Sequence, residues 1–153
     1  MDIAVWRSEY ETGHSEVDDE HKTLFKLINN LGYAISQESS PVILKQLLNE
    51  LINETVIHFE NEEELVKPVG YGNYFTHKAK HSYLEEVLMS VSEKVETDSS
   101  FLTLEIVQSI QDLIVRHICE EDMMMIQFFI KHQDMDSPVE VVPPLTVAQL
   151  FGE

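Results

Sequence analysis

Four stretches of the chain place apolar residues at alternating spacings of three and four, and this pattern restricts the possible folds more than any other feature. In the first stretch, which begins near Asp18, Leu24, Ile28 and Leu31 carry the repeat. Residues at these spacings fall on one face of an α-helix. The stretch therefore predicts an amphipathic helix that buries this face, and Asp18 or Asp19 is expected to cap its first turn.

Three further stretches show the same repeat, and their ends can be read from the sequence. Ser40-Pro41 combines a capping residue with a proline at the first helical position, and Pro68 is expected to end that helix. The third helix is expected to start at residues 73–76. The polar turn 97–100 separates it from the fourth helix.

The short connections between these helices define how they are arranged. Because each connection is only a few residues long, neighbouring helices must run antiparallel. The sequence therefore predicts an all-α fold, an up-down-up-down antiparallel four-helix bundle. Residues 1–132 are expected to form this single domain, with residues 1–16 as an extended N-terminal arm and residues 133–153 as a C-terminal tail.

The overall charge and composition exclude several classes of protein. The formal net charge is −18, and so acidic a surface repels phosphate backbones and anionic lipids, so neither nucleic acid nor a membrane is expected as a partner. No apolar run reaches the roughly 18 residues needed to span a bilayer, and the first residues do not resemble a signal peptide. The single cysteine, Cys119, allows no intramolecular disulfide. We expect a cytoplasmic protein that is monomeric or weakly oligomeric.

Ionisable residues interrupt the apolar faces of the predicted helices. A pair such as His77 and His81 could be two ordinary helix histidines, but several such positions occur together. Those that should face the core are His21, His58, Glu62, His77, His81 and His117. Burying these groups costs several kcal/mol each unless they are paired or bound. In an up-down bundle they all lie at one end, together with Asp122, which predicts one shared site.

The number and type of these side chains indicate a metal centre. Imidazole and carboxylate suit iron, zinc, copper or manganese, and the residues alone do not choose among these metals. Seven groups are too many for one ion. If two octahedral ions share two bridging carboxylates and one oxo or hydroxo bridge, about one coordination position stays open. An open position in an apolar bundle would suit a small diatomic ligand.

The spacing of these residues resembles that of the hemerythrins, especially the bacterial hemerythrin-like proteins. The family's pattern is an isolated histidine after an acidic turn, followed by HxxxE, HxxxH and HxxxxD. This chain has the pattern in the same order over about residues 6–129. The four segments are Val17-Asp18-Asp19-Glu20-His21, His58-Phe59-Glu60-Asn61-Glu62, His77-Lys78-Ala79-Lys80-His81 and His117-Ile118-Cys119-Glu120-Glu121-Asp122.

This resemblance implies a non-haem di-iron site with an oxo or hydroxo bridge that binds O2 reversibly. It assigns His77, His81 and His117 to one iron, and His21 and His58 to the other iron, which keeps the open position. Glu62 and Asp122 would bridge the two ions. Five apolar residues match positions that line or cover the family's oxygen pocket, although ordinary core packing would also explain them: Leu24, Phe59, Leu113, Ile114 and Ile118.

Two departures from the family pattern bear on this site. Glu20 stands where the family usually has glutamine, so it is either simply exposed or changes the charge near the second iron. Met123-Met124-Met125 replaces a stretch that commonly bears Lys and Tyr. These methionines are interpreted as soft core filler or as a contact for the tail rather than as pocket residues.

The step of five residues from His117 to Asp122 predicts a local irregularity. Five residues of regular α-helix would turn the two side chains about 140° apart. One extra residue in the turn, a π-bulge, would bring them to the same side, and such bulges are frequent at functional sites. We therefore expect a π-helical turn at this point.

Several other polar residues are not expected to belong to the site. His14 and His132 are interpreted as surface residues, and Cys119 faces away from His117 on a helix. The pairs Glu63-Glu64 and Glu120-Glu121 are interpreted as solvated positions beside the ligands.

Three functions are compatible with these residues. The first is reversible O2 binding for oxygen carriage, storage or sensing, with the protein not acting as an enzyme. The second is a di-iron enzyme, such as a peroxidase, an oxidase or a nitric-oxide-handling protein. The third is a sensor module that acts on a partner protein, with the tail as the possible contact.

Overall fold

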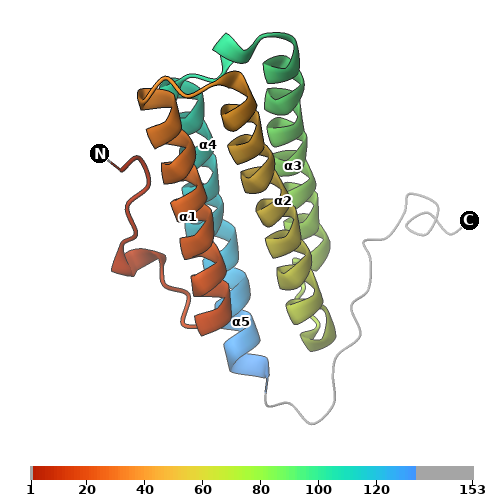
Figure 1. The fold of residues 1–153 in the computed structure, drawn as a ribbon. Coiled ribbons are helices and arrows are strands. Elements are labelled where there is room, and N and C mark those ends of the chain that lie inside the picture. Colours follow the sequence, from red (N-terminus) through yellow and green to blue (C-terminus); the bar gives the residue numbers. More distant parts are fainter. Residues whose placement is uncertain (1, 134–153) are drawn as a thin grey trace, which may run out of the picture.

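The computed structural model describes residues 2–133, and in this part of the chain all regular secondary structure is helical. The α-helices are α1 (Ser15–Ser36), α2 (Pro41–Val66), α3 (Tyr74–Thr97), α4 (Leu104–His117) and α5 (Met123–His132). A π-helical turn, Ile118–Asp122, joins α4 to α5, so that these two helices continue one rod (Figure 1). The prediction of an all-α fold is confirmed.

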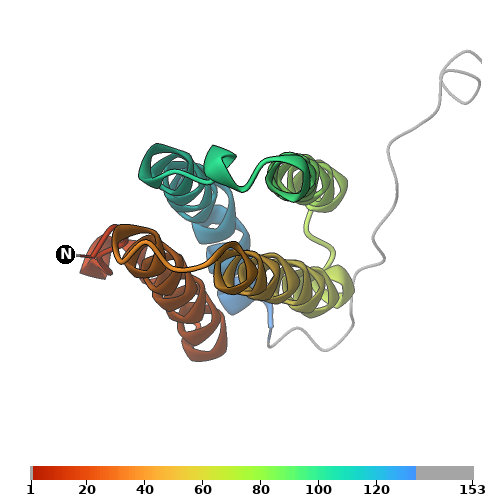
Figure 2. The same cartoon turned by 45° about the horizontal axis from the view of Figure 1, so that its top comes forward.

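The helices form an antiparallel four-rod bundle. α1 packs against α2 and against α4, and α2 packs against α3. Figure 2 shows these rods grouped around a common interior, with α5 continuing the fourth rod. Short 3₁₀ turns, Lys67–Val69 and Ser99–Phe101, lie in the connections on either side of α3. This is the predicted up-down-up-down arrangement.

The beginning of α2 follows the sequence prediction, whereas that of α1 does not. Ser40 Oγ accepts a hydrogen bond from the Ile43 N–H at 3.4 Å, and Pro41 is the first helical residue. α1 begins at Ser15, earlier than expected, because His14 Nδ1 caps it by accepting from the Val17 N–H at 3.2 Å. The prediction that Asp18 or Asp19 caps this helix is therefore wrong.

Asp18 instead connects the N-terminal arm to the bundle. One of its carboxylate oxygens accepts hydrogen bonds from the backbone N–H of Thr12 at 2.9 Å and from the Thr12 hydroxyl at 2.7 Å. Both residues are buried. The carboxylate is thus used to fix the chain just before α1, which explains why it is not available as a cap.

Aromatic packing and an amide pair hold the arm along α1. Trp6 lies edge-on to Tyr10 and Phe25, at ring-centroid distances of 5.7 and 5.2 Å. The Asn29 side chain forms two hydrogen bonds with the backbone of Ala4, one to its N–H and one to its carbonyl oxygen, each 2.8 Å long. The arm therefore covers part of α1 through specific contacts (Figure 1).

Two apolar clusters form the core. The larger cluster joins the arm and all four rods and contains residues such as Ile28, Leu31 and Leu51, which are completely buried. The smaller cluster lies around Val66 and Met125 near the α2–α3 connection. Met125 is fully buried whereas Met124 is 54% exposed, so one of the three consecutive methionines is core filler as expected.

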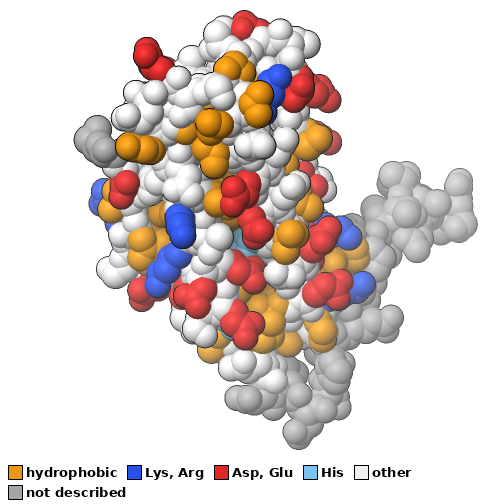
Figure 3. Space-filling view, in the orientation of Figure 1, with side chains coloured by type: hydrophobic (Ala, Val, Ile, Leu, Met, Phe, Trp, Pro, Cys, Tyr) orange, Lys and Arg blue, Asp and Glu red, His pale blue; other side chains and the backbone are white. Residues whose placement is uncertain are grey.

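The surface shows the acidic balance of the sequence. Acidic side chains are spread over the face drawn in Figure 3 and outnumber the basic ones. Within residues 2–133, no helix combines the length and apolarity that crossing a membrane would require. Residues 134–153, which make up nearly all of the predicted tail, lie outside the described residues, so the domain boundary at residue 133 stays a prediction.

Replacing Asn29 with alanine tests whether the arm contributes to stability. The substitution removes both hydrogen bonds to Ala4 and leaves partly buried backbone groups unpaired, so the free energy of unfolding should fall by about 1–3 kcal/mol. Denaturant unfolding measures this change. Asn30→Ala, at the neighbouring exposed position, is the control. Equal effects of the two substitutions would contradict a specific role for the Ala4 contacts.

Candidate metal centre

The π-helical turn brings the last two site residues together. α4 ends at His117, and the Met123 N–H bonds to the Ile118 carbonyl oxygen, five residues back. The wider turn places His117 Nε2 at 2.9 Å from Asp122 Oδ1. The predicted irregularity is confirmed, and it is what makes HxxxxD spacing compatible with one common site.

All seven predicted site residues meet in the bundle interior as two overlapping groups of potential ligand atoms. The three-histidine group consists of Glu62, His77, His81, His117 and Asp122. The two-histidine group consists of His21, His58, Glu62 and Asp122. In each group the ligand atoms lie within 4.8 Å of one another, and the two carboxylates belong to both groups.

The imidazoles point their Nε2 atoms toward the shared carboxylates. His21 Nε2 lies 3.0 Å from Asp122 Oδ2, and His77 Nε2 lies 3.0 Å from Asp122 Oδ1. His58 and His81 approach the two different oxygens of Glu62, each at 3.2 Å. Each carboxylate thus offers one oxygen to each side, which is the arrangement expected of a bridging ligand.

The burial of these atoms tests whether the site fits a metal. None of the seven residues is more than 6% exposed. The five Nε2 atoms and all four carboxylate oxygens make no hydrogen bond within the described residues. Orphaned polar atoms at this depth are costly unless they bind something. Convergent nitrogen and oxygen donors that lack other partners fit transition-metal ions.

The electrostatics of the metal-free site follow from the same contacts. Burial lowers the pKa of His58, but the Glu62 charge and the hydrogen bond to Glu20 outweigh it and raise the pKa to about 10. Burial likewise lowers the pKa of His77, and Asp122 with Glu62 raises it to about 9. Burial raises the pKa of Glu62, yet the nearby imidazoles hold it well below its usual value. Without metal, protons on His58 and His77 therefore offset part of the charge of the buried carboxylates.

Two glutamates outside the seven residues contact histidines of the site. Each lies against Nδ1, the ring nitrogen that does not face the shared carboxylates. Glu20 Oε1 lies 2.6 Å from His58 Nδ1, and Glu63 Oε2 lies 2.8 Å from His81 Nδ1. Of the two alternatives for Glu20, the structure therefore supports an effect on charge beside His58. The interpretation of Glu63 as a solvated residue is wrong, because α3 brings His81 against it.

Four further polar residues were also predicted to lie outside the site. All four do, but two of them are more buried than predicted. Cys119 belongs to neither ligand group, as predicted, and its side chain is exposed. Glu121 pairs with Lys80 at the surface. His14 and His132 are not simple surface residues, because both are partly buried: the His14 ring packs edge-on to Phe129, and the His132 ring stacks on Phe128.

Four of the five predicted oxygen-pocket residues line a cavity at the site, and the fifth lines an adjoining cavity. Leu24, Phe59, Ile114 and Ile118 line a small cavity whose polar side is formed by His21, His58, His117 and Asp122. Leu113 lines a neighbouring apolar cavity that shares Phe59 and Ile114 with the first. Leu84 lines both cavities and was not predicted. Whether any of these residues contacts a ligand stays a prediction.

Together, the fold and the two overlapping ligand groups define a helical-bundle protein that can hold a pair of metal ions. Residues 12–129 match the family model described as "Hemerythrin HHE cation binding domain". The chain therefore belongs to the hemerythrin family, and the resemblance found in the sequence is confirmed.

Individual relatives agree with this assignment. The chain is similar to the bacteriohemerythrin of Methylococcus capsulatus, with 30% identity over 123 residues, covering 80% of this chain and 93% of the relative. It is 29% identical to the myohemerythrin of Theromyzon tessulatum over 113 residues, covering 74% and 82%. A crystal structure of wild-type hemerythrin superimposes with a TM-score of 0.76 at 26% identity, covering 82% of this chain and 96% of that one.

The shared carboxylates make a prediction about metal stoichiometry. If Asp122 belongs to both groups, Asp122→Ala should remove both ions, whereas His21→Ala should remove mainly the ion of the two-histidine group. Metal analysis of the purified variants measures the bound ions per chain. Glu64→Ala, an exposed change next to the site on α2, is the control. Retention of both ions by Asp122→Ala would contradict a bridging role.

Metal loading should also release protons. In the metal-free protein the pKa of His58 is about 10 and that of His77 about 9, so both imidazoles carry a proton at pH 7 that a bound metal must displace. Because these folded-state values lie above the unfolded value, their protonation stabilises the metal-free fold below about pH 6.5, and this contribution is lost as the pH rises through 9–10. Calorimetry in buffers of different ionisation enthalpy counts the released protons, and a count of zero at pH 7 would contradict this assignment.

Proposed function

We propose that this protein binds O2 reversibly at a pair of iron ions held by the seven buried residues. The observation that carries the proposal is the inequality of the two ligand groups. Both share Glu62 and Asp122, but one group adds three histidines and the other adds two. Two ions bound in this way would differ by one protein ligand, which leaves a position for O2 on the side of His21 and His58.

The small cavity beside the two-histidine group supports this choice of position. Its apolar wall comes from residues such as Leu24, Ile114 and Ile118. Its polar side is formed by both histidines of that group, the shared Asp122 and one histidine of the other group, His117. An apolar wall disfavours water and charged ligands but accepts a small neutral molecule. The cavity therefore supports a diatomic ligand more than a larger substrate.

The roles of the chain's own residues follow from their geometry. Glu62 and Asp122 would hold the ions at a fixed separation, and His77, His81 and His117 would fill the positions of one ion. A bound iron pair would supply the electrons that reversible O2 binding requires. Membership of the hemerythrin family supports iron over the other metals that the same donors would accept.

The visible spectrum of the iron-loaded protein, cycled between argon and air, tests the proposal. We expect an absorption band that appears in air and disappears under argon over repeated cycles. Immediate and irreversible oxidation without the band would overturn reversible binding and favour a di-iron oxidase or peroxidase. One zinc ion per chain in place of two irons would overturn both.

A substitution in the cavity tests where O2 binds. Leu24→Phe adds volume to the wall that Leu24 contributes, so O2 affinity should fall on the order of 10-fold, the equivalent of about 1.4 kcal/mol, while two irons stay bound. Leu47→Phe, the same change at a half-buried core position, is the control. An unchanged O2 affinity in Leu24→Phe would contradict binding in this cavity.

Carriage, storage and sensing all need the same reversible site, so the physiological role rests on the partners of the protein. A contact through the C-terminal tail, a monomeric or weakly oligomeric state and a cytoplasmic location stay predictions from the sequence.

A further inference from the structure

Two glutamates that are not among the seven site residues contact the ligand histidines. Glu20 on α1 meets His58 on α2, and Glu63 on α2 meets His81 on α3. His58 belongs to the two-histidine group and His81 to the three-histidine group. Each group therefore has one histidine whose Nδ1 lies within hydrogen-bond distance of a glutamate carboxylate.

The direction of these hydrogen bonds follows from the other ring nitrogen. Nε2 of both histidines faces Glu62 at 3.2 Å, inside the ligand groups. A nitrogen that binds metal carries no hydrogen, so Nδ1 of a neutral ring carries it and donates to the glutamate. Nδ1 of His21 and Nδ1 of His77 form no hydrogen bond within the described residues, so the contact distinguishes His58 and His81 from these two ligands.

We infer that Glu20 and Glu63 are positioning residues, one for each ion, and that Glu20 increases electron donation to the ion with the open position. This inference rests on the metal centre proposed above. A carboxylate that accepts the Nδ1 hydrogen fixes the ring orientation and makes the imidazole a stronger donor. Stronger donation favours the ferric over the ferrous state.

The surroundings of the two glutamates differ in whether a neighbouring cation compensates the negative charge. Glu63 is close to a cation, since Lys78 Nζ lies 3.9 Å from its Oε1. The second oxygen of Glu20 accepts only from the neutral Asn61 amide at 3.3 Å, and no ion pair between Glu20 and a lysine or arginine is seen in residues 2–133. The negative charge of Glu20 is therefore less compensated.

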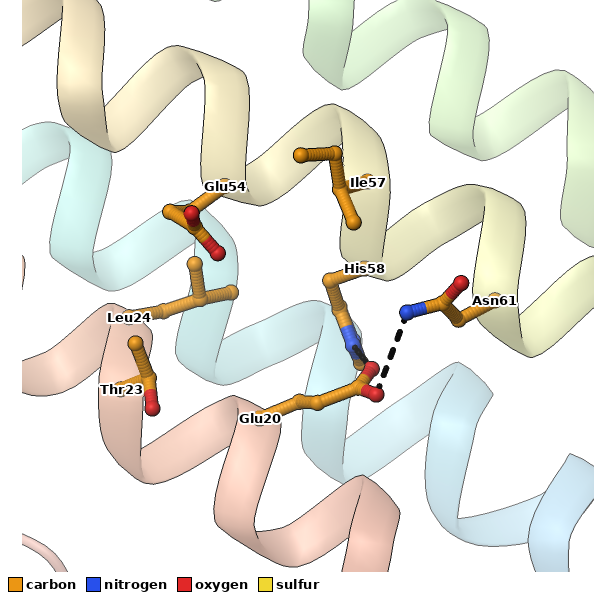
Figure 4. Close-up of a pocket in the computed structure, with 7 residues that line it drawn as sticks. All are labelled: Glu20, Thr23, Leu24, Glu54, Ile57, His58 and Asn61. Atoms are coloured by element: carbon orange, nitrogen blue, oxygen red, sulfur yellow. Dashed lines mark hydrogen bonds and ion pairs between the residues drawn. The ribbon is translucent and has the colours of Figure 1, made fainter.

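Glu20 also connects His58 to a surface cleft between α1 and α2. The cleft has a volume of about 170 Å³ and is lined by residues including Glu20, Leu24, Glu54 and His58. In Figure 4 the Glu20 side chain reaches from α1 to the His58 ring beside Asn61, whereas Glu54 lies apart with no marked bond. The Glu20 side chain is 33% exposed and that of Glu63 is 15% exposed.

The reduction potential of the iron-loaded full-length protein, titrated without O2, tests the inference. Glu20→Gln keeps an acceptor but removes the charge, so the potential of one ion should rise. Glu54→Gln removes a charge from the same cleft without touching His58 and is the matched control. A rise in Glu54→Gln as large as that in Glu20→Gln would show a general effect of charge and overturn the inference.

Measuring the metal affinity of single variants tests whether each glutamate supports a different ion. Glu20→Ala and Glu63→Ala should each weaken one ion about 10-fold or more, as loss of a hydrogen bond to a ligand histidine typically does. Competition with a chelator should then remove one ion early from either variant and both ions early from the double variant. Glu64→Ala is the control for Glu63→Ala, and thermal unfolding of each variant checks that the fold is intact.

Proton NMR of the zinc-loaded protein gives a readout that a purely structural role would not change. Zinc is diamagnetic, so the two hydrogen-bonded imidazole N–H protons should appear as separate downfield signals. Glu20→Ala should remove one signal and Glu63→Ala the other. Persistence of both signals in both variants would overturn the inference alone, whereas a wild-type protein that binds no metal pair would overturn the proposed function as well.

Discussion

The burial of five imidazoles and two carboxylates inside an apolar bundle is the constraint on which the rest of the structure depends. Each of these side chains is at most 6% exposed, and an uncompensated ionisable group at such depth costs several kcal/mol. A domain of this kind has a total stability of only about 5–15 kcal/mol. The fold can therefore exist only if the seven groups compensate one another or share bound ions. Their separations of about 3 Å allow either solution, with protons in the metal-free protein or with metal.

Bringing the site residues together also requires an irregular backbone, the π-helical turn Ile118–Asp122. A regular helix would point His117 and Asp122 in different directions, and a wide turn gives up regular i to i−4 hydrogen bonding to bring them together. The extra residue also shifts the phase of α5. In that phase Met125 and Ile126 are fully buried in the smaller apolar cluster. The site and the lower core are thus linked through one local irregularity.

Features that follow from local spacing or from the bundle topology could be predicted from the sequence, whereas individual contacts between side chains of separate segments could not. The start of α2 at Ser40-Pro41 and the irregular turn after His117 follow from local spacing. Asp18 was misread as a cap because its partner, Thr12, lies in the irregular arm. Glu63 was misread as solvated because its partner, His81, comes from α3. The convergence of the seven site residues was predictable because the up-down topology places them at one level.

The two halves of the proposed centre differ in their number of histidines, and they also differ in the exposure of the glutamate that contacts each half. The three-histidine group has one more potential protein ligand, and its supporting carboxylate, Glu63, is largely buried and near Lys78. The two-histidine group lies beside the small apolar cavity, and its supporting carboxylate opens on a cleft. If two irons occupied these groups as proposed, the ion of the two-histidine group would have one protein ligand fewer and could exchange a ligand without a movement of the protein. Confining the change to one ion would let the shared carboxylates stay in place, and a site that need not rearrange would be suited to release its ligand unchanged.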